Sequence, residues 1–365
     1  MTADAVGGVW QYALELAEQL ITCGNRVTLA VLGPDPDVIQ ETAARRVRSL
    51  RLMKTGCALD WMCSEAAPVA DAAAKIAGLA ADLGADIVHC NTPALAGAAV
   101  FPMPVVAVAH GCLATWWQAA YGGTPAPQFD WHRQMMRRGL IAADAVVAPS
   151  AAFAADVQAA YRLPCLPLVV HNGRTPPAAL AGPADRAGQA GQLDAALTVG
   201  RHWDKVKNTA LLDAVAGRIS VPFLCAGALQ SANGECLAPR HLQTLGQVDA
   251  LELAALLAQR PVFVSAARFE PFGLAVLEAA QAQCPLILSN IATFRELWDG
   301  AALFLDADDE QGFAATVTAL ITDPSRREEL GTAAADRAAR FTPHAMAQGM
   351  QRTYAKLLKG EEAAA

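Results

Sequence analysis

The sequence has little of several features that would point at once to a function class. Its 28 lysine and arginine residues against 35 aspartate and glutamate residues give a formal charge of −7, so no basic excess points to nucleic acid or anionic lipid. The N-terminal residues form no cationic, apolar leader, and the most apolar later window, residues 98–109, is too short to cross a bilayer. These absences predict a cytoplasmic protein without a nucleic-acid partner.

Paired cysteines and cofactor signatures are also absent. The nine cysteines are odd in number and include no Cys-x-x-Cys pair, which disfavours a disulfide framework or a zinc site and predicts mostly buried thiols. No G-x-G-x-x-G follows an apolar strand, which disfavours a dinucleotide oxidoreductase. Two Asp-x-Asp sequences, residues 35–37 and 306–308, lie in a proline-rich loop and just before a helix that Asp308 or Asp309 would cap. No metal is expected.

The chain does have abundant apolar residues in an alternating order. Its 365 residues, 54% hydrophobic, are enough for two domains with sizeable cores. Short β-rich runs alternate with longer helical patterns, which predicts an α/β protein with parallel sheets covered by helices. The predicted strands are residues 27–32, 87–90, 105–109, 145–148, 168–171, 197–199, 223–226, 262–265, 286–289 and 302–305.

A stretch rich in proline, glycine and alanine, residues 174–192, is predicted to be a linker. It separates an N-terminal domain, residues 1–173, from a C-terminal domain, residues 193–342. A terminal helix and a tail are expected over residues 343–365.

The first predicted helix follows Gly7 and Gly8, and Gly24 is placed to end it. A nucleotide-fold domain normally enters such a glycine turn from a buried strand, but only Met1 to Val6 precede it here. The first strand is therefore expected to be truncated, because the chain starts late or the strand is a stub.

The sharpest candidate site follows the predicted strand 262–265. Glu270 and Pro271 are expected to open a helix on which Glu278 lies further along. The helical rise would put the two carboxylates at most ~12 Å apart, and ionised carboxylates accept paired hydrogen bonds from diols. Free backbone N–H groups at Phe272 to Leu274 would favour the binding of an anion, such as a phosphate, at the start of the helix. Taken alone, the two glutamates are more often a helix cap and a solvated residue.

This segment resembles the E-x7-E motif of the retaining glycosyltransferases of family 4, also called glycosyl transferase group 1. The resemblance implies that Glu270 contacts a donor sugar and Glu278 the nucleotide ribose. Gln283 departs from the family's usual glycine, which puts the helix-to-strand turn in question more than the chemistry. The matching residues are Glu270, Phe272, Gly273, Leu274, Glu278, Ala279 and Pro285.

Two further segments match the family in chain order. After the predicted strand ending at Val199, Gly200-Arg201 and Lys207-Asn208 would hold the donor diphosphate, and preorganised cations there would stabilise the departing charge. The alternative is that Arg201 and Lys207 are only surface cations on a loop, and Lys205 could equally be the cation assigned to Lys207. His110 ends strand 105–109, where the family has a histidine close to the donor sugar. The histidines regarded as structural or solvated are His89, His132, His171, His202, His241 and His344.

Weaker signals complete the resemblance. Gly7 and Gly8 match the family's glycine-rich first loop, which approaches the donor, although a glycine pair can be only a tight turn. Trp116 and Trp117 could stack on an acceptor sugar, with a core role more common. Arginines on a predicted helix could meet an anionic lipid-linked acceptor, but a solvated helix face is favoured. They are Arg133, Arg137 and Arg138.

The resemblance implies the GT-B fold, with two facing Rossmann-like domains, an interdomain cleft and a C-terminal helix that crosses back to the first domain. The function implied is a metal-independent, retaining hexosyltransferase of the kind used in polysaccharide biosynthesis, which moves a glycosyl group from a nucleotide diphosphate sugar to a hydroxyl acceptor. The acceptor would be a glycan, a lipid-linked sugar or a small molecule, and peripheral contact with the inner face of the membrane stays open. Two alternatives remain: a nucleotide-sugar hydrolase or epimerase on the same fold, and a non-catalytic relative that binds nucleotide sugar.

Overall fold

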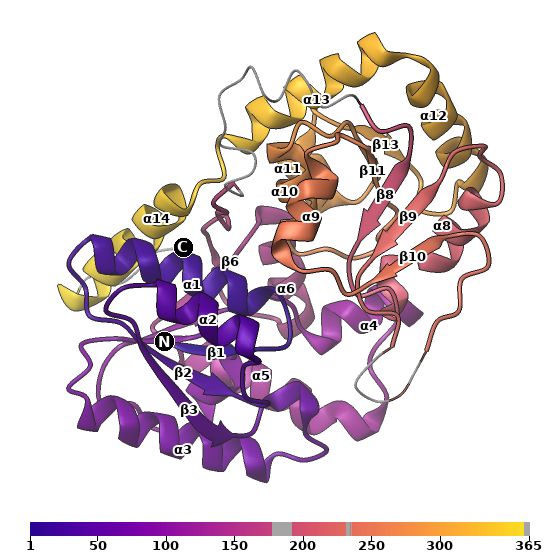
Figure 1. The fold of residues 1–365 in the computed structure, drawn as a ribbon. Helices are drawn as coiled ribbons and strands as arrows, with labels where there is room; N and C mark the ends of the chain where they lie inside the picture. The colour runs from indigo at the N-terminus through magenta and orange to yellow at the C-terminus, as the bar shows by residue number, and fades with distance from the viewer. Residues whose placement is uncertain (177–191, 231–233, 235, 361–365) are drawn as a thin grey trace. The chain divides into compact units, whose positions relative to one another are not determined.

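The computed structural model describes residues 1–176, 192–230, 234 and 236–360. It divides into two units (Figure 1). Unit 1 consists of Met1–Gly173 together with Thr342–Ala365, and unit 2 consists of Arg174–Phe341. From residue 177 to residue 191, the predicted linker lies outside the described residues.

Unit 1 contains parallel strands in two groups. In the first group β1 pairs with β2 and β2 with β3, and in the second the order is β4-β5-β6-β7. The Asn91 amide, just after β4, joins the groups, because its Nδ2 donates to the Thr2 carbonyl of β1 at 2.7 Å. The resulting order, 3-2-1-4-5-6, is that of a Rossmann fold. The strands are β1 (Thr2–Asp4), β2 (Thr28–Leu32), β3 (Arg51–Cys57), β4 (Val88–Cys90), β5 (Val105–Val108), β6 (Ala145–Ala148) and β7 (Leu168–Val169).

The first strand of unit 1 is present. β1 is three residues long, fully buried and paired in parallel with β2, from Thr2 opposite Ala30 to Asp4 opposite Leu32. The expected entry into the glycine turn is therefore made by a short strand.

Helix α1 of unit 1 buries one face, which includes Leu16 and Leu20, and the chain leaves it through Gly24, whose φ is +87°. Helix α14 lies beside α1 (Figure 1) and adds Met346 and Met350 to the same core, so the last helix belongs to unit 1. The helices are α1 (Gly8–Thr22), α2 (Val38–Arg46), α3 (Ala67–Asp82), α4 (Leu113–Tyr121), α5 (Asp130–Ala142), α6 (Ala151–Tyr161) and α14 (Pro343–Leu358).

Unit 2 contains a six-stranded parallel sheet in the order β10-β9-β8-β11-β12-β13. Its first strand in sequence, β8, is central, and the chain adds strands first on one side of β8 and then on the other. The strands are β8 (Ala196–Val199), β9 (Phe223–Ala226), β10 (Gln243–Gly246), β11 (Val262–Ser265), β12 (Leu286–Ser289) and β13 (Leu303–Leu305).

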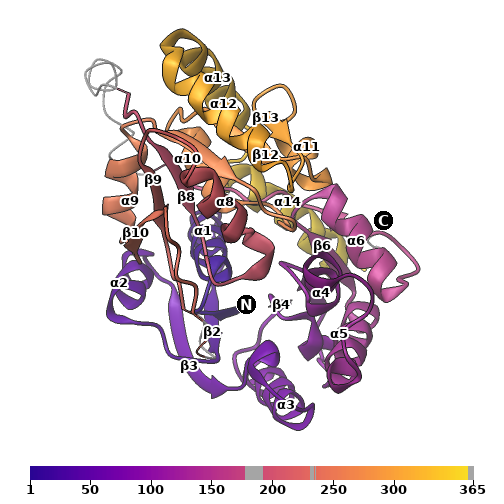
Figure 2. The ribbon, with the colours of Figure 1, turned by 90° about the vertical axis from the view of Figure 1, so that its right-hand side faces the viewer.

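The helices of unit 2 cover its sheet, and α12 and α13 both pack against β12 (Figure 2). The core includes the fully buried rings of Phe263, Phe294 and Trp298. The helices are α8 (Thr209–Ala216), α9 (Ala250–Leu257), α10 (Leu274–Gln281), α11 (Ala292–Trp298), α12 (Glu310–Thr322) and α13 (Pro324–Ala338).

Gln283 occupies the turn from α10 to β12 in a left-handed conformation, with φ +63°. Its N–H bonds to the Ala280 carbonyl at 2.9 Å, and the Cys284 N–H bonds to the Ala279 carbonyl at 3.0 Å. These two bonds form a Schellman motif, in which glycine is the usual residue at this position. The turn thus keeps its geometry although a side chain is present.

The cysteines are free thiols: Cys57, Cys90, Cys225 and Cys284 are buried, whereas Cys23, Cys165 and Cys236 are exposed. The other two, Cys63 and Cys112, are half-buried, so the prediction that most would be buried was wrong. In the part of the chain that the structure describes, no helix combines the length and apolarity needed to cross a membrane.

A helix cap lies within the first Asp-x-Asp sequence, and another lies directly after the second. The side chain of Asp37 accepts from the Gln40 N–H at 2.8 Å before α2, and that of Asp309 accepts from the Gly312 N–H at 2.8 Å before α12. A carboxylate at a helix N-terminus satisfies backbone groups that otherwise lack partners, which accounts for both residues.

Candidate functional site

The strand order of unit 2 defines where a ligand would bind. β8 and β11 are neighbours, but the chain leaves them in opposite directions, so the loops after their carboxyl ends separate. Open α/β sheets bind ligands at such a switch point. Gly200 to Lys207 follow β8, and Ala266 to Glu270 follow β11.

The structure brings Lys207 and Glu270 together at this switch point. The Lys207 Nζ lies 2.5 Å from Glu270 Oε2, and the two side chains are 21% and 18% exposed. Asn208 ties the same two loops, since its Nδ2 donates to the Ala266 carbonyl at 3.2 Å. A cation and a carboxylate, both largely withdrawn from water, are therefore held next to each other.

Asp204 organises the loop after β8. Its buried carboxylate accepts from the Val206 N–H at 3.3 Å and pairs with Arg201 Nη2 at 3.3 Å. Arg201 is half-exposed, and its guanidinium lies 5.6 Å from the centre of the Trp203 ring. Lys205, the alternative cation, is exposed. Asp204 was not among the predicted site residues, although an aspartate just before a short cationic turn is a recognisable capping signal.

The predicted start of α10 was wrong. Pro271 does not begin the helix, which starts three residues later at Leu274, and Glu270 lies in the preceding loop. Gly273 causes the difference: it adopts φ +93°, a left-handed conformation that ends the loop and lets the helix begin. The two glutamates therefore do not share one helix.

Residues Phe272 to Leu274 have different environments. Phe272 is buried against Phe341, with ring centres 5.5 Å apart, so its side chain belongs to the core. A Cβ on Gly273 would lie 3.3 Å from the Glu270 Cγ, so the glycine leaves room for that glutamate. Leu274 is half-buried at the start of α10, which no side chain among the described residues caps. Its first N–H groups can receive an anion.

Glu278 pairs with an arginine that was not among the predicted site residues. Its Oε1 lies 2.7 Å from Arg174 Nε, and the side chains are 14% and 16% exposed. The residues are separated by more than one hundred positions, so no local signal could have paired them.

In unit 1, His110 is held by Asn91. The His110 Nε2 lies 2.8 Å from Asn91 Oδ1, and the His89 Nε2 lies 2.9 Å from the same oxygen. The Asn91 Nδ2 donates to the Thr2 carbonyl, which can only accept, so the orientation of the amide is fixed. Asn91 Oδ1 is therefore the acceptor, and both histidines carry their proton on Nε2.

This tautomer decides what His110 can do. Burial lowers the pKa of His110 to about 3, so the ring is neutral near pH 7. The Tyr12 ring meets its face edge-on at 4.4 Å between centres. With Nε2 occupied as the donor to Asn91, the remaining ring nitrogen, Nδ1, is a hydrogen-bond acceptor. His110 can accept from a hydroxyl but cannot act as a charged acid.

Gly7 and Gly8 lie where β1 passes into α1. Gly7 precedes the helix in an extended conformation and makes no side-chain cap, and the Asp4 carboxylate accepts from the Val6 N–H at 3.0 Å in the turn before it. Backbone N–H groups at this helix start are open to an anion.

Trp116 and Trp117 are half-exposed on α4, which begins three residues after His110. Trp117 lies 4.7 Å from Tyr121 and 5.6 Å from Phe129 between ring centres, so an aromatic cluster forms at the surface of unit 1. The expected core role was wrong, because neither indole is buried. An acceptor role stays a prediction.

The three arginines predicted on one helix lie on α5. Arg137 and Arg138 are exposed, and Arg133 pairs with Asp130 at 3.0 Å. The favoured interpretation of a solvated helix face agrees with this placement.

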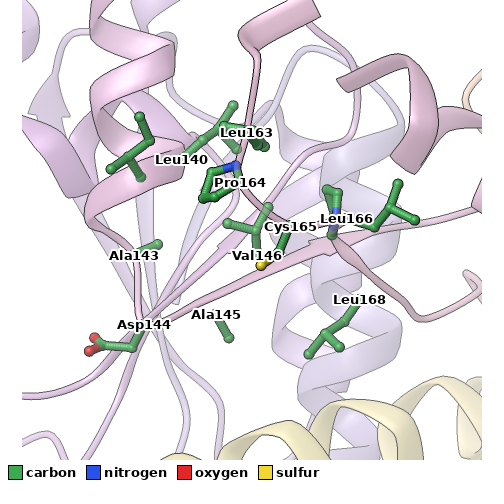
Figure 3. A pocket seen from close by; sticks show the side chains of 12 residues that line it. Leu140, Ala143, Asp144, Ala145, Val146, Leu163, Pro164, Cys165, Leu166 and Leu168 are labelled. Atoms are coloured by element: carbon green, nitrogen blue, oxygen red, sulfur yellow. The ribbon is translucent and has the colours of Figure 1, made fainter. Parts of the chain in front are cut away.

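A cavity of about 170 Å³ in unit 1 lies elsewhere (Figure 3). Leu140, Asp144, Ala145 and Leu163 are among the residues that line it, and the Asp144 carboxylate accepts from the Val105 N–H at 2.7 Å. It lies at the amino end of β6, whereas Asn91 and His110 follow the carboxyl ends of β4 and β5. The cavity is thus at the opposite edge of the unit 1 sheet from Asn91 and His110.

Comparison with known proteins decides the family. The model described as Glycosyltransferase Family 4 matches residues 6–176, and that described as Glycosyl transferases group 1 matches residues 226–337. The chain belongs to glycosyltransferase family 4. The family 4 model thus matches the segment with Gly7, Gly8 and His110, and the group 1 model the segment with Glu270 and Glu278.

Two relatives from Mycobacterium tuberculosis are similar in sequence. Glycogen synthase is 35% identical over 100 residues, which are 27% of this chain and 24% of that protein, so the match spans about a quarter of its length. Alpha-maltose-1-phosphate synthase is 29% identical over 314 residues, with 72% of this chain and 79% of that protein covered.

Solved structures share the fold of this family 4 chain. Sucrose-phosphate synthase from Thermosynechococcus elongatus superimposes with a TM-score of 0.78 at 19% identity, covering 99% of this chain and 96% of that one. Anabaena HepE in complex with UDP-glucose gives a TM-score of 0.69 at 18% identity, covering 98% and 100%. The fold is the GT-B fold, with two Rossmann-like domains.

Proposed function

We propose that this family 4 member is a retaining glycosyltransferase that moves a glycosyl group from a nucleotide diphosphate sugar to a hydroxyl acceptor. The observation that carries the proposal is the pairing of Lys207 with Glu270 at the switch point of unit 2. A carboxylate can accept hydrogen bonds from sugar hydroxyls, and the adjacent ammonium offsets its repulsion of a nearby diphosphate. A sugar joined to a diphosphate needs both kinds of group side by side.

Each residue would have a distinct role in the reaction. The departing nucleoside diphosphate gains negative charge as the glycosidic bond breaks, and Arg201, Lys207 and the start of α10 would stabilise that charge. Glu270 would orient the sugar without attacking it. The departing phosphate would take the acceptor proton, and the acceptor would attack from the face that the phosphate leaves, which retains the anomeric configuration. In this scheme side-chain cations supply the charge stabilisation, and no metal is required.

The donor is tested first. In a thermal-shift screen against UDP, GDP, ADP and their sugar conjugates, the nucleotides of one base should raise the melting temperature of the protein, because a ligand that binds only the folded state stabilises it. Uridine nucleotides are tested first, because the similar Anabaena structure is a complex with UDP-glucose. If none of the nucleotides moves the transition, the proposal is wrong.

The site is tested next in a transfer assay with that donor. Glu278→Ala should weaken nucleotide binding, and Arg201→Ala should lower turnover about tenfold or more, since each removes a group that contacts the donor. Wild-type rates for both variants would refute these roles. The anomeric configuration of the product, read by NMR, tests retention, and an unchanged rate in EDTA tests metal independence.

The same assay separates the alternatives. Release of free sugar without dependence on an acceptor would identify a hydrolase. Nucleotide-sugar binding without turnover on any acceptor would identify a non-catalytic relative.

A further inference from the structure

Glu278 is held from the residue at which the chain enters unit 2. Arg174 is the first residue of that unit and Phe341 the last, and the Arg174 N–H donates to the Phe341 carbonyl at 3.2 Å. Gln281 Nε2, on α10, donates to the Arg174 carbonyl at 2.7 Å. The backbone of Arg174 is therefore fixed on both sides before its side chain is considered.

The side chain of Arg174 then reaches Glu278. Glu278 and Gln281 are three residues apart on α10 and so share a face of the helix. One binds the guanidinium and the other the backbone of the same arginine. This double attachment sets the position of Arg174 relative to α10.

Burial makes the pairing of Arg174 with Glu278 important. Both side chains are more than four-fifths withdrawn from water, at 16% and 14% exposed. A carboxylate in such surroundings without a cationic partner loses hydration that nothing replaces. Among the described residues, Arg174 is the hydrogen-bond partner of Glu278, and it engages Oε1. An ionised carboxylate has further lone pairs, so capacity for hydroxyl donors remains.

We propose that Arg174 is a positioning residue for the ribose of the donor nucleotide. It fixes the rotamer of Glu278 through the bond to Oε1, so that the carboxylate accepts hydrogen bonds from the two ribose hydroxyls together. This inference rests on the proposed function, which assigns the ribose to Glu278. Arg174 acts through Glu278 and does not touch the nucleotide.

The test uses nucleotides with and without the ribose hydroxyls. Calorimetry on the full chain would measure Kd for UDP, GDP and ADP and for their 2′,3′-dideoxy forms. The wild type and Arg174→Ala are compared, with Arg174→Gln as a second variant that keeps a hydrogen-bond donor but removes the charge. Arg326→Ala is the matched control, because Arg326 forms an exposed pair with Glu329 on α13.

Arg174→Ala should raise the Kd of the ribonucleotide about tenfold, the effect of one charge-assisted hydrogen bond, and should leave the Kd of the dideoxynucleotide unchanged. Arg174→Gln should fall in between. In the Glu278→Ala background the further loss of Arg174 should have little effect, because both changes remove the same interaction. In turnover, KM for the donor should rise while kcat changes little.

The outcomes separate the two claims. If the wild type binds none of the nucleotides, the proposed function fails and takes this inference with it. If the wild type binds and Arg174→Ala either binds equally well or weakens both nucleotide forms by the same factor, only this inference is overturned. If Arg174→Ala does not fold, the same comparison of the two nucleotide forms is made with Arg174→Gln.

Discussion

Each unit contains a buried, neutral histidine, and this makes acid stability a sharp test of the structure. His89 in unit 1 is 3% exposed and bonds through Nδ1 to the Tyr354 hydroxyl at 2.6 Å, while His202 in unit 2 is 3% exposed and bonds through Nε2 to the Ala226 carbonyl at 3.0 Å. Burial lowers the pKa of His89 to about 3 and that of His202 to about 4. Both folded-state values lie below those of an unfolded histidine.

The direction of the pH effect follows from proton counts. An unfolded histidine has a pKa of about 6.5, so below that pH the unfolded chain binds one more proton per buried histidine than the folded chain. The free energy of unfolding then falls by about 1.4 kcal/mol per pH unit for each such histidine. Between about pH 6.5 and pH 5 this amounts to about 2 kcal/mol per histidine, and the loss continues towards the folded pKa. His110, with its pKa lowered by burial to about 3, adds a similar slope in unit 1.

The perturbation is His89→Gln, whose amide can still donate to Asn91 and accept from Tyr354. Urea titrations at about pH 7 and about pH 5, followed by hydrogen exchange resolved by peptide, should show that this variant loses about 2 kcal/mol less in unit 1 than the wild type. His202→Gln should act in the same way on unit 2 alone. The control is His171→Gln, at an exposed position. An equal acid loss in His89→Gln and the wild type would refute the reasoning.

Three further predictions concern turns and positioning residues. Gln283→Gly should raise the free energy of unfolding of unit 2 by about 0.5–1 kcal/mol. Glycine removes the strain of a left-handed backbone that carries a side chain, and this gain exceeds the cost of glycine's greater entropy in the unfolded chain; a decrease in urea midpoint would contradict this. Gly273→Ala should cost about 1–2 kcal/mol and weaken donor binding, since its Cβ would press on Glu270 at a positive φ; unchanged nucleotide affinity would exclude that contact as relevant. Asn91→Leu should destabilise unit 1 by about 2–4 kcal/mol and reduce kcat/KM about tenfold or more, because the buried His89 and the half-buried His110 both lose their acceptor; a folded variant with full activity would show that the tautomer of His110 is unimportant.

The sequence predicted most of the strands, including β7 and β13 at the ends of their sheets, but not β3 and β10. Each predicted strand overlaps one in the structure, because a strand covered on both faces must be an uninterrupted apolar run. β3 and β10, at the ends of their sheets, were missed because an edge strand keeps polar side chains towards solvent. β1 was considered truncated, since three residues are too few to show a pattern.

Only the part of the candidate site that follows from the order of the strands could be predicted. Lys207 and Glu270 follow neighbouring strands, so their meeting at one edge is a consequence of topology. The start of α10 could not be predicted from Pro271, because a proline fits both the first turn of a helix and a loop. The left-handed conformation of Gly273 makes Leu274 the first helical residue. The Arg174 to Glu278 pair depends on tertiary packing and leaves no trace in spacing.

The return of α14 to unit 1 has a consequence for how this chain acquires its structure during synthesis. Unit 2 is one continuous stretch, whereas the core of unit 1 includes Met346 and Met350. As the ribosome extends the chain from its N-terminus, the residues of unit 2 are all made before unit 1 receives its last helix. Until then the apolar flank of α1 that α14 covers is bare, and His89 lacks the Tyr354 hydroxyl. The unit that is translated first therefore cannot be completed until all residues of the other have been made.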